Sequence, residues 1–313
     1  MHVFICALKA LRFCLRRALC FMEQKIRIYL AWKATYAPRA SINYKLWLKY
    51  FVEVSGDKAI EDYTIHDVVK YQAWLENRFK SYSVNYAIVI VKNFFKFFKE
   101  QDYKCMQPSL IKIPKMASKS HRAISEEEFE RIISIMPSSD FSTLRDLLMV
   151  RILWDTGIRV GELTDLDLSH INEQKHSAVI ITKKNGKKRM IIWSKETHRL
   201  LLRYISLRLK VTCLKGTPAL FLGLNQNREP GIRISRRSVE RIVKHWVDRA
   251  GIKERITPHS FRHGWAHKRR DQNAPLAFIQ RGLGHVSPIS TFIYQNYHDW
   301  EFEKSAKKYL KIA

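Results

Sequence analysis

Apolar residues recur at helical spacing from residue 25 to about residue 103, and no alternating strand pattern interrupts them. Four of them fall on one face of a helix with about 3.6 residues per turn: Tyr44, Trp47, Leu48 and Phe51. Thr64 and Asp67 have the spacing of a capping box, which marks the start of another helix. The pattern predicts a small bundle of about four helices within residues 25–105.

Phenylalanines and lysines alternate along residues 92–99, near the end of this bundle. The spacing predicts a buried stripe of phenylalanines and three lysines on the solvated face: Phe94, Phe95, Phe97 and Phe98 against Lys92, Lys96 and Lys99. Contact of these lysines with phosphate does not conflict with that packing role, because the cations lie on the other face. They are candidate phosphate ligands.

Residues 106–120 have no periodicity, and Pro108 and Pro114 oppose a continuing helix. The stretch carries cations that include Lys112 and Lys115. It is typical of an extended, basic linker that follows a phosphate backbone.

Residues 1–24 precede the bundle and are apolar, with several cations among them. They fit an N-terminal extension. The alternative is a basic amphipathic helix that docks on DNA or lies on a membrane surface.

The second domain, residues 121–313, combines helices with one clear sheet signal. Two β-branched or apolar runs flank Asn185-Gly186, which is the strongest short-range indication of a β-hairpin. Helices are expected at residues 125–136, 142–156, 160–166, 196–210, 235–250, 258–270, 274–282, 288–297 and 299–310. The predicted fold is mainly α with a small β-hairpin or sheet, in which a helical domain precedes an α+β domain.

Composition restricts the partners. The 313 residues suffice for two domains, and 46% hydrophobic residues suffice for a sizeable core. The formal charge of +27 predicts a polyanionic partner, most often nucleic acid, although a ribosomal or membrane-surface protein can carry such a charge too. The five cysteines form no CxxC pair, which favours a reducing compartment, and no stretch reaches the roughly 18 uncharged apolar residues of a membrane span.

The segment TGIRVGEL, residues 156–163, places a glycine turn before a short helix. The turn presents Arg159 at the helix start, where its guanidinium and free backbone N–H groups can face an anion. Glu162 lies one turn further on and could hold that guanidinium. An ordinary surface ion pair is the alternative for the motif taken alone.

Two later motifs carry further polar groups. Thr257 and Pro258 start a helix on which His259 and Arg262 lie one turn apart, side by side on one face. Gly284 then permits a sharp turn from which His285 can project. Tyr294 follows nine residues later, and such a tyrosine, taken alone, is ordinarily a packing residue.

In order and spacing, TGIRVGEL, KNGKKR, HSFRH, LGH and Tyr294 resemble the tyrosine recombinase (phage integrase) family. Residues 40–105 are similar to that family's SAM-like core-binding domain and 121–313 to its catalytic domain, which implies a clamp around DNA. The resemblance implies these catalytic residues: Arg159, Lys184, His259, Arg262, His285 and the nucleophile Tyr294, with Glu162 in support. Lys183 is the alternative to Lys184 as the catalytic lysine. Counting five residues back from Arg189 favours Lys184.

The resemblance also implies the activity and the partners. A member of the family cleaves and rejoins double-stranded DNA through a 3′-phosphotyrosyl intermediate without metal, cofactor or ATP, as a homotetramer on two sites. Integration or excision of a mobile element is the expected role, possible partners are accessory DNA-bending or directionality factors, and the expected location is cytoplasmic and nucleoid-associated. The alternatives are Xer-like dimer resolution, a type IB topoisomerase, and a non-catalytic DNA-binding protein.

Further DNA contacts are expected from cations near the hairpin and on the helix at 235–250. The candidates are Lys183, Lys187, Lys188, Arg236, Arg237, Arg241 and Lys244. The amphipathic C-terminal segment, residues 299–313, forms either an intramolecular closing helix or a tail that packs on a neighbouring protomer.

Overall fold

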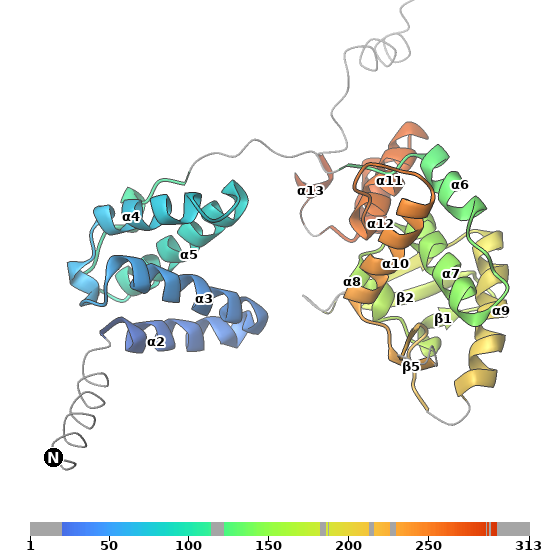
Figure 1. Ribbon diagram of the computed structural model, residues 1–313, viewed down its shortest axis with the longest axis horizontal. Helices are drawn as coiled ribbons and strands as arrows, with labels where there is room; N and C mark the ends of the chain where they lie inside the picture. Colours follow the sequence, from blue (N-terminus) through green and yellow to red (C-terminus); the bar gives the residue numbers. More distant parts are fainter. Residues whose placement is uncertain are drawn as a thin grey trace, which may run out of the picture. The chain divides into compact units, whose positions relative to one another are not determined.

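The computed structural model describes residues 21–113, 122–181, 186, 188–212, 216–225, 230–285, 287 and 289–292. The chain divides into two compact units, Met1–Lys119 and Ser120–Ala313, and each is described by itself (Figure 1). Both are built mainly of helices, and the strands of the described residues all lie in the second unit. The predicted fold class, mainly helical with a small sheet, is confirmed.

The described part of the first unit contains the four helices that the periodicity predicted: α2 (Phe21–Tyr36), α3 (Pro38–Ser55), α4 (Ile65–Glu76) and α5 (Ser81–Lys99). The expected capping box starts α4, where the backbone N–H of Thr64 donates to Oδ2 of Asp67 at 2.8 Å. Helix α2 begins before residue 25, the expected start of the bundle. Met22 is fully buried because it continues the inward face that Ile26 forms one turn later.

Helix α5 buries nine of its residues in this unit. Its predicted apolar stripe is confirmed, because Phe94, Phe95 and Phe98 are fully buried. Lys92 differs from the expected solvated cation: it is half-buried, and its Nζ donates to the carbonyl oxygen of Ile111 at 3.0 Å. The reason is tertiary, since the chain after the 3₁₀ turn Pro108–Leu110 returns along α5 and offers an acceptor.

Most of the expected helices of the second unit are present with small shifts at their ends. They are α6 (Glu126–Ser134), α7 (Phe141–Thr156), α8 (Val160–Thr164), α9 (Lys195–Thr212), α10 (Arg236–Arg249), α11 (Pro258–Asp271), α12 (Leu276–Leu283) and α13 (Ile289–Phe292). Helix α7 is buried along most of its length, and α9 and α11 pack against it. Residues 293–313, which include the expected tail helix, lie outside the described residues.

The expected hairpin is confirmed as β2 (Ser177–Ile181) and β3 (Lys188–Ile192), which pair antiparallel. Strand alternation buries Ile180 and Ile191 and places Arg189 directly opposite Ile180. A two-residue strand, β1 (Ile171–Asn172), adds to the edge of β2.

A second hairpin, β4 (Leu222–Leu224) with β5 (Pro230–Arg233), was not predicted, because the sequence indicated neither a helix nor a strand between residues 210 and 235. Both strands are very short and contain a glycine, so neither shows the alternation that reveals a strand. Tertiary contact maintains them: Arg145 on α7 donates to the carbonyl oxygen of Leu222 at 2.9 Å.

Candidate active site

A left-handed glycine links α7 to α8 and sets the direction of Arg159. Gly157 has φ +59°, and a Cβ at this position would lie 3.0 Å from Cγ of Trp265. Both the backbone conformation and the close indole therefore require glycine. Arg159 then occupies the N-cap of α8 with its side chain partly exposed, the position expected from the sequence.

Glu162 is the carboxylate around which this turn is organised. Its Oε2 accepts from the backbone N–H of Arg159 at 2.8 Å, and its Oε1 accepts from Nη1 of Arg159 at 3.2 Å. The sequence indicated the pairing of Glu162 with Arg159, but it did not reveal a second partner of Glu162, which is Arg189. Arg189 donates from Nη1 to Oε1 and from Nη2 to Oε2, each at 2.8 Å.

The Glu162–Arg189 pair is buried, with the two side chains 9% and 8% exposed. Burial raises the pKa of Glu162, but the hydrogen bonds and positive charge of Arg189 outweigh burial and leave the pKa below its usual value. No sequence motif assigned a role to Arg189. Its inward direction could have been read from strand alternation, since Arg189 precedes the inward-facing Ile191 by two residues.

Arg262 joins the two glycine turns of the site. It lies on α11, is 2% exposed, and donates from Nη1 to the carbonyl oxygen of Gly157 at 2.8 Å. Its Nη2 donates to the carbonyl oxygen of Leu283 at 2.6 Å. The fork of a single guanidinium therefore fixes the turn that carries Arg159 and the turn that carries His285.

His285 follows Gly284, which ends α12 with φ +64°. The half-buried imidazole pairs through Nδ1 with Oγ1 of the fully buried Thr291 on α13, at 2.8 Å. Its backbone N–H donates to the carbonyl oxygen of Gln280 at 3.1 Å. Thr291 on α13 thus holds the ring, and α12 holds the backbone of the same residue.

The pKa of His285 is lowered to about 4, first by burial and then by positive charge around the ring. The charged groups that act on it come from three elements: Arg262 and His259 on α11, Arg159 at the start of α8, and Arg189 on β3. The structure therefore brings these residues to one place. Such a convergence of cations on a neutral imidazole is suited to an anion such as a phosphodiester.

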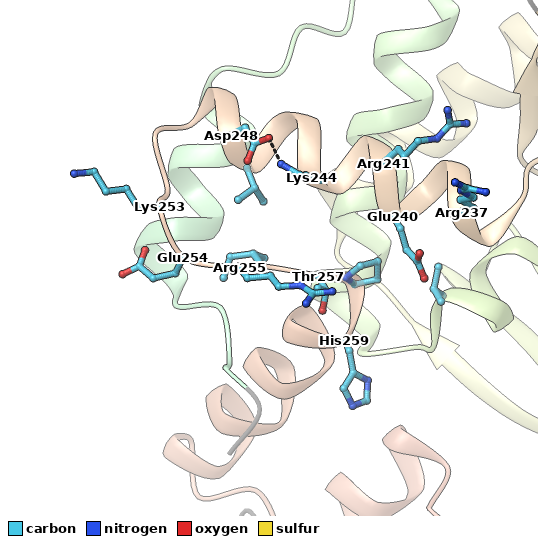
Figure 2. Close-up of a pocket in the computed structure, with 14 residues that line it drawn as sticks. Arg237, Glu240, Arg241, Lys244, Asp248, Lys253, Glu254, Arg255, Thr257 and His259 are labelled. Carbon is cyan, nitrogen blue, oxygen red and sulfur yellow. Dashed lines mark hydrogen bonds and ion pairs between the residues drawn. The ribbon is translucent and has the colours of Figure 1, made fainter. Parts of the chain in front are cut away.

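His259 is exposed on the first turn of α11, where its ring meets that of His263 edge to face with the ring centroids 4.5 Å apart. A groove of about 750 Å³ opens beside it, between α10 and the loop that leads to Thr257 (Figure 2). The groove is lined by more basic than acidic side chains: Arg237, Arg241, Lys244, Lys253 and Arg255 against Glu240, Asp248 and Glu254. It suits a polyanion that runs past His259.

The remaining candidates for DNA contact differ in their surroundings. Within the described residues, Lys99, Lys112 and Lys188 form no ion pair with a carboxylate, whereas Lys96 pairs with Glu100 at 3.6 Å and Lys244 with Asp248 at 2.6 Å. The guanidinium of Arg236 lies against Gly161 on α8, beside Arg159. Outside the described residues lie Lys115, Lys183, Lys184, Lys187 and Tyr294.

Two negative findings concern the described part of the chain. No three His, Cys, Asp or Glu side chains gather there in a way that could hold a metal ion. Within the same residues, no helix is long and apolar enough to cross a membrane.

Comparison with known proteins matches both units. Residues 122–300 match the phage integrase family, and residues 22–105 match the phage integrase N-terminal SAM-like domain. The chain is 32% identical over 237 residues to the tyrosine recombinase XerA of Pyrococcus furiosus, covering 74% of this chain and 76% of that protein. It is 30% identical to the tyrosine recombinase XerC of Natranaerobius thermophilus, covering 70% and 73%.

Solved structures share the fold at low identity. The XerH site-specific recombinase in its post-cleavage complex with a palindromic difH substrate matches with a TM-score of 0.70 at 18% identity, covering 86% of this chain and 79% of that one. The Tn1549 transposon integrase with a circular intermediate DNA matches with a TM-score of 0.69 at 16% identity, covering 92% and 98%. By its sequence, its fold and the family match of both units, the chain belongs to the phage integrase family and is a tyrosine-type, site-specific DNA recombinase.

Proposed function

We propose that this recombinase cleaves and rejoins double-stranded DNA through a 3′-phosphotyrosyl intermediate formed on Tyr294. The observation that carries the proposal is the double hydrogen bond of Arg262 to the carbonyl oxygens of Gly157 and Leu283. It holds Arg159 and His285 around one place, where a scissile phosphate would balance the converging positive charge.

The proposed roles follow from the chemistry of each group. Arg159 and Arg262 stabilise the negative charge that develops on the non-bridging oxygens, while Tyr294 attacks the phosphorus. The bond from phosphorus to the 5′ oxygen breaks, and Lys184 supplies the proton to the leaving 5′-hydroxyl. His259 and His285 donate hydrogen bonds to the phosphate or relay the phenol proton, and His285 is neutral at pH 7 because its pKa is about 4.

The sharpest test uses a nicked suicide DNA substrate, from which the short downstream fragment that carries the freed 5′-hydroxyl diffuses away and leaves the protein attached to the 3′-phosphate. Wild type should form a covalent protein–DNA adduct that survives denaturing electrophoresis. Tyr294→Phe should form none, whereas Tyr297→Phe, a matched change three residues later, should keep it. An adduct with Tyr294→Phe, or none with wild type, contradicts the proposal.

The biological setting has two candidate forms. The sequence favoured integration or excision of a mobile element, whereas the similarity to XerA and XerC proteins favours resolution of chromosome or plasmid dimers. Selection of the preferred site from random DNA, followed by a search of the source genome, separates them. A site near the replication terminus supports dimer resolution, and a site at the boundary of a mobile element supports integration.

We further propose that two DNA sites are joined by four protomers, each clamped on the duplex by both units and the basic linker. Strand exchange needs a 5′-hydroxyl from a partner duplex to attack the phosphotyrosine and release the tyrosine, so two sites with two protomers each complete one exchange. Light scattering of the protein with its site should give the mass of four chains and two duplexes. We expect the protein to act in the cytoplasm on the nucleoid, which a fluorescent fusion can test.

A further inference from the structure

We propose that Arg189 is a positioning residue of this recombinase, which holds the Arg159 turn, the His285 turn and the β2–β3 hairpin in register. The inference deepens the proposed function and rests on it. Arg189 lies on β3 and reaches both turns with one buried guanidinium.

The first link runs through Glu162 to Arg159. Arg189 donates two parallel hydrogen bonds of 2.8 Å to the Glu162 carboxylate, the geometry with the best-defined orientation for a guanidinium and a carboxylate. The same carboxylate accepts from the backbone N–H and the guanidinium of Arg159. Loss of the fork at Arg189 would free Glu162 to rotate and would release Arg159 with it.

The second link runs to the turn that carries His285. Nε of Arg189 donates to the carbonyl oxygen of Gly282 at 3.2 Å. A Cβ at Gly284 would lie 2.6 Å from Nη1 and 2.9 Å from Cζ of Arg189, so the guanidinium covers the α-carbon immediately before His285. Arg189 therefore touches this turn at two points, whereas Arg262 supports it from Leu283.

The third link is to the hairpin itself. Arg189 pairs with Ile180 in the ladder, and in the sequence Lys184 falls between the two strands. Anchoring the Arg189 side chain at Glu162 and Gly282 fixes β3 relative to the two turns. The strand that follows the proposed general acid, Lys184, in the sequence is thereby tied to Arg159 and His285.

A purely stabilising ion pair is the competing explanation, and three variants separate it from positioning. Arg189→Lys keeps the positive charge but loses the fork, and Arg189→Met loses both. Arg145→Lys is the matched control, because Arg145 forms an equally buried pair with Asp146 and also donates to a backbone carbonyl, that of Leu222. Thermal unfolding, DNA affinity and the single-turnover cleavage rate on the suicide substrate are measured for each.

We expect Arg189→Lys to cleave about 10²-fold more slowly at saturating DNA, with DNA affinity unchanged, because the reacting groups are misplaced. Arg145→Lys should lose thermal stability but keep the cleavage rate. A folded Arg189→Lys that cleaves at the wild-type rate overturns the inference, and so does an equal loss of rate in Arg145→Lys. If Arg189→Lys does not fold, Glu162→Gln, which breaks the same fork from the acceptor side, must show the slow cleavage.

The pKa of His285 supplies a readout that a change in packing alone does not move. His285 faces Arg262 and His259 from α11, Arg159 from α8 and Arg189 from β3, with Thr291 as its hydrogen-bond partner on α13. Arg189→Met removes one of these charges and should move the pKa of His285 upward, whereas Arg189→Lys should leave it low. Titration of the His285 ring by NMR measures this pKa without catalysis. A wild type that forms no adduct refutes the proposed function. Equal His285 pKa values in Arg189→Met and wild type refute the inference.

Discussion

Arg262 donates a hydrogen bond of 2.8 Å to the carbonyl oxygen of Gly157, a residue 105 positions earlier in the chain. The bond joins the helix that carries His259 to the turn that presents Arg159. The buried guanidinium of Arg262 both orients the two turns through hydrogen bonds and supplies positive charge beside His285. A change at Arg262 should therefore lower stability and cleavage together.

Arg262→Lys keeps the positive charge but loses the fork, so it should leave at least one of the two carbonyl oxygens, those of Gly157 and Leu283, without a donor. A buried acceptor left without its donor costs about 1–3 kcal/mol, so we expect a loss of this size in the free energy of unfolding. Urea denaturation measures the loss. Adduct formation on the suicide substrate should disappear as well, and full retention of cleavage would contradict the proposed role.

Gly157→Ala should destabilise the second unit more than a left-handed backbone alone explains. A non-glycine residue in this conformation costs about 1–2 kcal/mol, and here the added Cβ would also press on Trp265. Gly251→Ala is the matched control, since Gly251 has φ +68° and open space around a Cβ. Equal losses in the two urea denaturation curves would show that the contact with Trp265 carries no cost.

The pKa of His285 should rise when DNA binds. In the free protein burial and neighbouring cations lower it to about 4, and a phosphate anion beside the ring favours its protonated form. NMR titration of the ring with and without an uncleavable site, in the Tyr294→Phe background, measures the change. A His285 pKa that stays low in the complex would place the phosphate elsewhere.

Folding stability should also depend on His285 in a defined pH window. The folded pKa is depressed below the ordinary value of 6.5, so between about pH 4 and pH 6.5 the unfolded chain binds the proton more readily. Stability therefore falls as the pH drops through this window. His198 and His267, whose pKa values are also lowered, contribute in the same direction. The difference between wild type and His285→Asn isolates the part due to His285, and a constant difference from pH 4 to pH 7 would contradict it.

DNA binding should weaken steeply with salt, and Arg241 should account for part of the slope. Each phosphate contact contributes about 0.9 to the dependence of log affinity on log salt concentration, so Arg241→Ala should reduce the slope by about that amount. Lys175→Ala is the control, because Lys175 is exposed in the β1–β2 turn and does not line the groove. An unchanged slope for Arg241→Ala in fluorescence anisotropy would remove α10 from the DNA interface.

The local part of this structure could be predicted from neighbouring residues. The capping boxes at Thr64 and Ser125 join residues three apart, and the β2–β3 pairing follows from strand alternation around Asn185-Gly186. The motifs that position Arg159, Glu162, His259, Arg262 and His285 are also short, and the structure brings these five residues together. Helix propensity, capping and turn preferences act over a few residues, so they can be predicted from a short stretch of sequence.

Tertiary structure alone decided which distant groups meet. Arg189 and Glu162 are 27 positions apart, and Arg262 and Leu283 are 21 apart, so no local pattern pairs them. Tertiary packing likewise places the carbonyl oxygen of Ile111 where Lys92 donates to it. The short β4–β5 hairpin, which has no strand signal in the sequence, also forms in the tertiary structure. A buried donor needs some acceptor, but which acceptor it meets depends on how the helices pack. The sequence by itself therefore determined the chemical groups and their local supports, and the fold determined that one guanidinium, Arg189, ties the Arg159 turn and the His285 turn to a hairpin.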